Sequence, residues 1–107
     1  MNIRVDSDTQ ENSVTLTLEG DLIVGHQEDL SELVQLTEFI MRKMPRPERI
    51  VFDLSAVRRI DSAGVGALLR LHMTLKRNSV HLRLRGVRRD VQRALSISRI
   101  DSVLDIE

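Results

Sequence analysis

A serine between an aspartate and two glycines is the segment of this sequence best suited to chemistry. It stands in the run Asp61-Ser62-Ala63-Gly64-Val65-Gly66, just before an apolar-periodic stretch. The side-chain oxygen of Asp61 or of Ser62 can accept the free backbone N–H groups that open a helix. A phosphate on Ser62 would lie at the positive end of the helix dipole and would add about −1.5 to −2 charges to a neutral patch. Two roles therefore stand open for Ser62: a phosphorylation switch, or a helix cap and nothing more.

The two glycines of this run also need a physical reason. Gly64 and Gly66 fall in the first turns of the predicted helix, where each costs about 1 kcal/mol relative to alanine. A glycine is nevertheless favoured where the backbone must pack closely against another segment or where another molecule approaches it closely. Close packing within the fold and close approach by another molecule both remain open as reasons for these two glycines.

Enzymatic alternatives find little support in the sequence. The order around Ser62 is not the Gly-x-Ser-x-Gly elbow of hydrolases, and no histidine follows at a plausible triad position. The three histidines are scattered and cysteine is absent, so no metal-ligand spacing exists. No Gly-x-x-x-x-Gly-Lys loop is present either. We expect a protein that is not an enzyme and that needs no cofactor or metal.

Hydrophobic periodicity predicts the element order β-β-α-β-α-β-α. Asn12-Ser13 is a plausible hairpin turn, and strands joined through helices should be parallel with right-handed crossovers. The apolar run at 50–54 is typical of a central strand covered on both faces. The expectation is a single α/β domain over residues 1–107, with a mixed, mostly parallel sheet, an antiparallel N-terminal hairpin and three to four helices. Strands are expected near residues 3–5, 14–18, 50–54 and 80–84, helices near 26–44, 63–77 and 87–95, and a short strand or extended tail at 103–106.

Composition narrows the classes of function and the compartment. The chain has 107 residues and no cysteine, which fits one domain in a reducing cytosol. No signal peptide and no membrane-spanning apolar run is visible, so we expect a cytoplasmic protein without membrane insertion. The only aromatic residues are Phe39 and Phe52, and this scarcity disfavours direct binding of nucleic acid.

Charge is distributed unevenly along a chain whose net charge is zero. Residues 1–40 carry nine acidic side chains and one basic one, whereas residues 41–100 carry fifteen basic and four acidic ones. Basic residues are dense between Arg83 and Arg93. Either the two halves neutralise each other in the fold, or the asymmetry marks a charged partner surface. The basic run itself is either a solvated face or a surface that docks an acidic partner or steers association.

The serine segment resembles the signature of the STAS family, the domain shared by sulfate transporters and anti-sigma factor antagonists. Family members carry Asp-Ser-Ser-Gly or Asp-Ser-Thr-Gly, then apolar-Gly-apolar, after a central strand that ends near Asp-Leu. Here Asp53-Leu54 closes the predicted strand and the run 61–66 follows. Gly20-Asp21-Leu22 is similar to the family's Gly-Glu-Leu-Asp after the second strand. The similarity in length and element order extends over nearly the whole chain.

The resemblance implies a regulatory switch of the anti-sigma factor antagonist type. In such proteins the serine after the motif aspartate, here Ser62, is phosphorylated by a partner that is both anti-sigma factor and serine kinase, with a histidine-kinase-like ATPase fold. The unphosphorylated form binds this kinase, the phosphorylated form releases it, and a serine phosphatase restores binding. The partner-binding residues implied in this chain are Asp21, Asp61, Ser62, Ala63, Gly64, Val65 and Gly66.

Two departures from the family pattern leave a second function open. Ala63 replaces the usual second serine or threonine, and Ile23 stands where an acidic residue often follows the leucine. The alternative is a constitutive STAS scaffold module of an ABC-transporter or stress-signalling complex, in which Ser62 has only a structural role.

Overall fold

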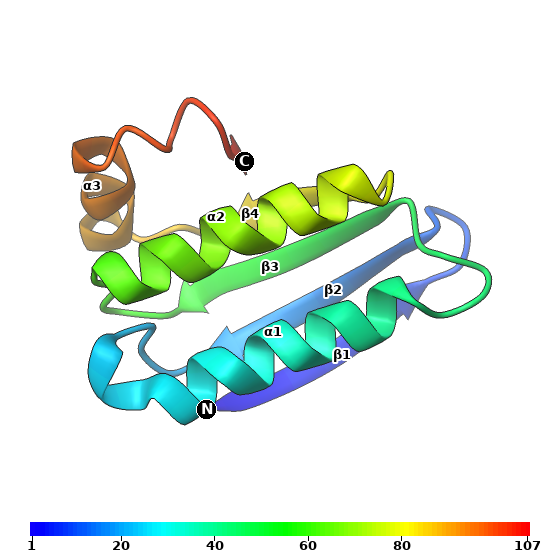
Figure 1. The fold of residues 1–107 in the computed structure, drawn as a ribbon, viewed down its shortest axis with the longest axis horizontal. Coiled ribbons are helices and arrows are strands. Elements are labelled where there is room, and N and C mark those ends of the chain that lie inside the picture. The colour runs from blue at the N-terminus through cyan, green and yellow to red at the C-terminus, as the bar shows by residue number, and fades with distance from the viewer.

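The computed structural model describes residues 1–107 as one α/β domain with a five-stranded sheet (Figure 1). The sheet order is β1-β2-β3-β4-β5, in which only β1 and β2 are antiparallel. The predicted α/β class, hairpin and mixed sheet are therefore confirmed. The elements are β1 (Asn2–Asp8), β2 (Ser13–Glu19), a 3-10 turn η1 (Val24–His26), α1 (Gln27–Met41), β3 (Arg49–Ala56), α2 (Ser62–Arg77), β4 (His81–Arg85), α3 (Arg89–Ile97) and β5 (Asp105–Ile106).

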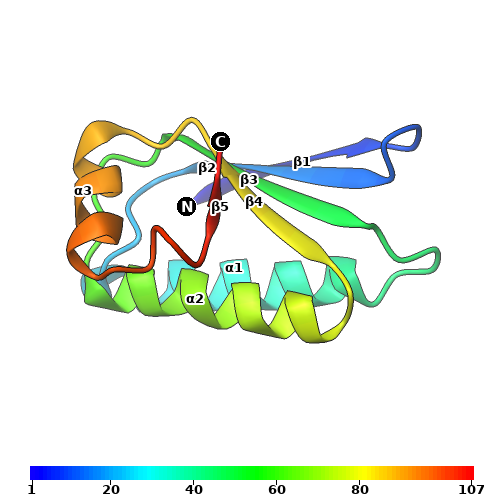
Figure 2. The same cartoon turned by 90° about the horizontal axis from the view of Figure 1, so that it is seen from above.

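The strand order explains where the helices lie. Each parallel strand is added beside the one before it, always in the same direction across the sheet. Right-handed crossovers then place successive helices on the same face. Accordingly, α1 and α2 lie side by side on one face, and α3 lies at the end of the sheet where β3 finishes (Figures 1 and 2).

The expectation that both faces of the central strand are covered is wrong. The helices α1 and α2 cover one face only (Figure 2). The other face carries mostly polar side chains, such as Thr17, Asp53 and Arg85 in register across β2, β3 and β4. Val51 points to that open face, where its neighbours in register are Thr15 and Arg83. It is nevertheless buried, because the flanking side chains shield it. The run at 50–54 looked continuously apolar because Val51 stands on the open face between the core residues Ile50 and Phe52. No second layer of helices covers that face.

The core lies between the sheet and the helical layer. Phe52 is its largest fully buried side chain, and leucines dominate the remainder. They alternate along β2 and β4 and follow one face of α2, as the predicted periodicities require. Burying a leucine or phenylalanine stabilises the fold by about 1.5–3 kcal/mol.

The structure differs from prediction at some helix ends and in the loop before α1. Helix α3 begins and ends two residues later than predicted, at 89 and 97. Helix α1 ends at Met41, earlier than residue 44, and Met44 is almost fully exposed beside the two prolines. The turn η1 was not predicted, because three residues are too few to give a periodic pattern. No helix is both long enough and apolar enough to cross a membrane.

Candidate functional site

Two loops meet where α2 begins, and backbone hydrogen bonds hold them together. Leu22 lies in the loop after β2, and Arg59, Ile60 and Asp61 lie in the loop after β3. The Leu22 N–H donates to the Arg59 carbonyl at 3.0 Å, and the Asp61 N–H donates to the Leu22 carbonyl at 3.2 Å. Leu22 and Ile60 form a parallel bridge. Both loops follow parallel strands, so the site lies at the carboxyl edge of the sheet, where α/β proteins commonly bind ligands.

Asp61 is the N-cap of α2 and fixes both loops through its carboxylate. One oxygen, Oδ1, accepts the backbone N–H groups of Ala63 at 3.0 Å and Gly64 at 3.2 Å. The other, Oδ2, accepts the N–H of Val24 at 2.8 Å. One side chain thus caps the helix and also holds η1 against it.

These hydrogen bonds make the charged form of Asp61 favourable. The N–H of Val24 lowers its pKa most, partial burial opposes this, and the N–H groups of Gly64 and Ala63 lower it further. The pKa of Asp61 therefore lies below the ordinary aspartate value of 3.8. At neutral pH the cap is a carboxylate that accepts hydrogen bonds and donates none.

Ser62 is the first residue of α2, and its side chain is exposed. The cap is Asp61, so the interpretation of Ser62 as a helix cap is wrong. The hydroxyl stands at the positive end of the helix dipole, next to the Ala63 and Gly64 N–H groups that already donate to Asp61. Phosphorylation at this position would require no rearrangement of the core.

The two glycines of the motif have different surroundings. A Cβ at Gly64 would lie 2.1 Å from the Leu22 carbonyl oxygen and 2.6 Å from the Ile60 side chain. Gly64 therefore permits the contact between the two loops inside the domain, which corrects its expected role toward a partner. Val65 is also buried and offers a partner little surface. A Cβ at Gly66 would meet nothing within 4 Å, so this position remains open to approach from outside.

Asp21 lies beside this site but already has an internal partner. Its Oδ2 accepts a hydrogen bond from Nε–H of Arg59 at 3.0 Å and lies 2.9 Å from Nη2 of the same guanidinium. The pair adds a third connection between the loops that follow β2 and β3. Sequence reasoning missed Arg59, because a residue 38 positions away gave no local signal.

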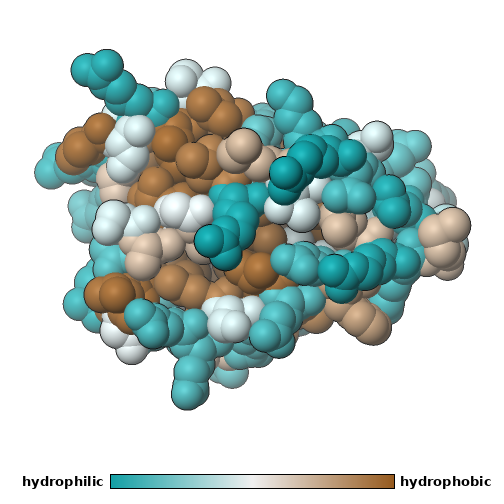
Figure 3. Space-filling view, in the orientation of Figure 1, coloured by the Kyte–Doolittle hydropathy of each residue, from teal (hydrophilic) through white to brown (hydrophobic).

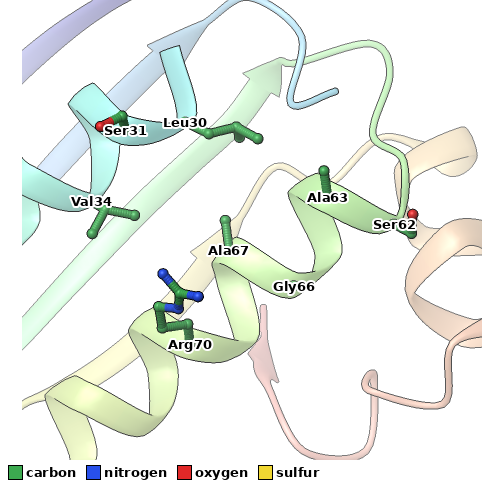
Figure 4. Close-up of a pocket in the computed structure, with 8 residues that line it drawn as sticks. All are labelled: Leu30, Ser31, Val34, Ser62, Ala63, Gly66, Ala67 and Arg70. Atoms are coloured by element: carbon green, nitrogen blue, oxygen red, sulfur yellow. The ribbon is translucent and has the colours of Figure 1, made fainter. Parts of the chain in front are cut away.

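A groove between α1 and α2 begins at Ser62 and extends along both helices (Figure 4). It has a volume of about 400 Å³. Leu30 and Val34 line it from α1, and Ala63, Gly66 and Ala67 line it from α2. Arg70 reaches toward Val34 at the end remote from Ser62 (Figure 4). The α1 residues and Arg70 were not predicted as site residues, because the sequence does not specify which faces of two helices meet.

Much of the dense basic region is used inside the fold. Arg83 Nε donates to Asp105 at 2.9 Å, Arg85 lies 3.5 Å from Asp53, and Arg88 donates to the Ser55 carbonyl at 3.1 Å. Hydrophilic side chains cover one half of the face that carries the helices, and apolar ones gather over the half with α3 (Figure 3). The carboxylates that pair with Arg83 and Arg85 lie outside the acidic stretch 1–40, so these contacts do not join the two oppositely charged parts of the chain. Arg89 and Arg93 on α3 are exposed.

Comparison of the sequence with models of known protein families identifies the family to which this fold and loop arrangement belong. The model of the STAS domain matches residues 4–107. The chain therefore belongs to the STAS domain family, and the predicted resemblance is confirmed.

Solved structures share the fold at low sequence identity. A putative anti-sigma factor antagonist from Thermotoga maritima superposes with a TM-score of 0.82 at 19% identity, covering 97% of this chain and 84% of that one. The Bacillus cell fate determinant SpoIIAA in its phosphorylated form superposes with a TM-score of 0.71 at 15% identity, covering 99% of this chain and 91% of that one. A sulfate transporter family protein from Wolinella succinogenes superposes with a TM-score of 0.68 at 17% identity, covering 92% of this chain and 75% of that one.

Proposed function

We propose that this protein is an anti-sigma factor antagonist whose binding is switched by phosphorylation of Ser62. The unphosphorylated form binds an anti-sigma factor that is also a serine kinase of the histidine-kinase-like ATPase fold. Phosphorylation releases the partner, and a serine phosphatase restores binding. The observation that carries the proposal is the exposed hydroxyl of Ser62 at the first position of α2, separate from the cap that holds the helix.

The surroundings of Ser62 support binding of a protein surface. Ser62 and Ala63 border the groove between α1 and α2, and Val24 exposes 58% of its surface on η1, which Asp61 holds nearby. A partner that covers this region would exclude water around a neutral hydroxyl. A phosphate dianion there would cost desolvation and would repel any carboxylate of the partner. Release therefore follows from local electrostatics without a change of fold.

The internal contacts divide the predicted site residues by role. Ser62, Ala63 and Gly66 are accessible and are proposed to touch the partner. Asp61 and Asp21 act as positioning residues, because their carboxylates hold the two loops in place.

The test compares the chain with three variants bound to resin: Ser62→Ala, Ser62→Asp and the matched control Ser98→Ala at the end of α3. Each is incubated with extract of the native cell, and the retained proteins are identified by mass spectrometry. Wild type, Ser62→Ala and Ser98→Ala should retain the same kinase-type ATPase, and Ser62→Asp should lose it. The purified ATPase with ATP should then phosphorylate wild type and Ser98→Ala, but not Ser62→Ala.

Equal capture of one partner by all of these forms would contradict the switch. It would favour the alternative of a constitutive scaffold module in a transporter or stress-signalling complex. Neighbouring permease genes would point the same way, whereas a neighbouring gene for a histidine-kinase-like ATPase would favour the switch.

A further inference from the structure

A second depression lies on the other side of α2, away from Ser62. The chain between α3 and β5 passes along the outer side of α2 (Figures 1 and 2). Between them is a cavity of about 480 Å³ that is open to solvent. We call it the α2–tail groove; its lining residues are Leu69, His72, Met73, Lys76, Arg77 and Val103.

The floor of the α2–tail groove is apolar and uncovered. Met73 exposes 53% of its surface and Val103 exposes 50%, and both line the same depression with the partly buried Leu69. Single exposed apolar residues are ordinary in soluble proteins, but several in one concavity mark a place where another molecule binds.

The rim of the groove at the C-terminal end of α2 is positively charged. Lys76 and Arg77 are both exposed, and neither takes part in any ion pair within the chain. This distinguishes them from Arg59, Arg83 and Arg85, which have carboxylate partners. The unpaired cations give the groove a charge that an acidic ligand would complement.

His72 adds an unsatisfied polar atom to the same groove. Its Nδ1 is buried and has no hydrogen-bond partner in the chain. Burial, and then the nearby Lys76, lower the pKa of the imidazole, so the ring is neutral at physiological pH. The neutral ring adds no charge to the rim, so Lys76 and Arg77 supply the positive charge of the groove.

We propose that the α2–tail groove binds an acidic amphipathic helix of a partner protein. Apolar side chains spaced three or four residues apart on that helix would contact Leu69, Met73 and Val103. Glutamates or aspartates beside them would meet Lys76 and Arg77. The concave shape favours a helix ridge over a bilayer, because a flat membrane surface cannot fill a depression.

This groove works independently of the Ser62 switch. Met73 follows Ser62 by eleven residues on one helix, which separates them by roughly 16 Å at 1.5 Å per residue. A helix bound in the α2–tail groove would therefore leave the loops around Asp61 free. The protein could bind two partners at once, with only one of them controlled by phosphorylation.

The test uses a synthetic helical peptide with leucines at positions i, i+3, i+4 and i+7 and glutamates on the flanking positions. A second peptide carries lysines in place of the glutamates. Binding to the unphosphorylated chain is measured by fluorescence anisotropy, and the contacted residues by NMR shifts. The acidic peptide should shift the Met73 and Val103 methyl signals and should bind at least tenfold tighter than the basic one, because only the acidic peptide complements the rim.

Charge reversal provides the matched comparison. Lys76→Glu/Arg77→Glu should weaken binding of the acidic peptide about tenfold or more, because attraction becomes repulsion. Arg89→Glu/Arg93→Glu on α3 makes the same change in net charge and should leave binding unchanged. Met73→Glu, at an exposed position, should also abolish binding while unfolding at the same temperature as wild type.

Three results would overturn the proposal. The first is equal binding of both peptides, and the second is equal loss of affinity in the two charge-reversed variants. The third is association with phosphatidylserine vesicles that Lys76→Glu/Arg77→Glu abolishes, without binding of either peptide; this would identify a membrane-binding surface. None of these outcomes bears on phosphorylation of Ser62, so failure here and failure of the switch are separable.

Discussion

The carboxylate of Asp61 accepts the backbone N–H of Val24 at 2.8 Å, across 37 residues of sequence. The same side chain caps α2 through Ala63 and Gly64. The start of the helix that presents Ser62 is therefore fixed to the loop that follows β2. The proposed acceptor serine occupies a rigid position even though it is exposed.

Asp61→Ala should destabilise the domain. Loss of an N-cap costs about 0.5–2 kcal/mol, and here the contact to Val24 is lost as well. A decrease in melting temperature of about 4 °C or more is expected for a domain of this size. Circular dichroism measures it. Asp90→Ala, at an exposed aspartate in the first turn of α3, is the control and should cause less than half the decrease; equal decreases would contradict the cap.

The two motif glycines should respond oppositely to alanine. Gly64→Ala would bring a methyl group into the Leu22 carbonyl and should destabilise the fold by about 1–3 kcal/mol, as overpacking does. Gly66→Ala meets no atom and should stabilise α2 by up to about 1 kcal/mol. The free energies of unfolding of the two variants, measured by urea denaturation, test this prediction. Similar free energies of unfolding for both variants would show that the loops are not held as described.

Ser62→Asp should fold as well as wild type. A negative charge in the first turn of a helix contributes about 0.3–1 kcal/mol of stabilisation at low ionic strength. The melting temperature should therefore stay the same or rise slightly, and the rise should shrink in high salt. A clear fall would mean that loss of partner binding by this variant reflects unfolding and does not report on the switch.

Acid should destabilise the protein partly through Asp61. Its folded pKa is below the ordinary value of 3.8, so the unfolded chain takes up the proton first as pH falls. The contribution of Asp61 is complete above the unfolded pKa and is lost as pH falls from about 3.8 through the folded pKa. Unfolding free energies measured from pH 7 to pH 2 should fall less steeply in Asp61→Asn than in wild type. Parallel curves would contradict the lowered pKa.

Asp105 supplies a further contribution to acid sensitivity at the last strand. A hydrogen bond from His81 Nε2 at 2.6 Å, and then one from Arg83, hold the pKa of Asp105 below its usual range. β5 has only two residues, and this cluster of side chains connects one of them to β4. The Glu107 N–H donates to the Leu84 carbonyl at 2.8 Å. Protonating Asp105 should loosen β5 first, which amide hydrogen exchange would detect as a lower protection factor of this N–H, relative to its intrinsic exchange rate, at low pH. A protection factor of the Glu107 N–H that stays constant between neutral and low pH would contradict this.

The sequence by itself determined the element order, the parallel sheet with its opening hairpin and the position of Ser62 at a helix start. These follow from local periods of two and 3.6 residues and from capping chemistry, which act between near neighbours. It left open which of Asp61 and Ser62 is the cap, because both side chains can accept the same N–H groups. Tertiary structure decided that point through Val24, which is distant in sequence and adjacent in space.

Tertiary structure alone also decided the role of Gly64 and the uncovered face of the sheet. The close contact of Gly64 with the Leu22 carbonyl depends on two loops meeting, which no local pattern encodes. The apolar run around Val51 looked like a strand covered on both faces, but flanking side chains shield that valine. Both grooves along α2 likewise arise from long-range packing, since they depend on which segments of the chain flank the helix.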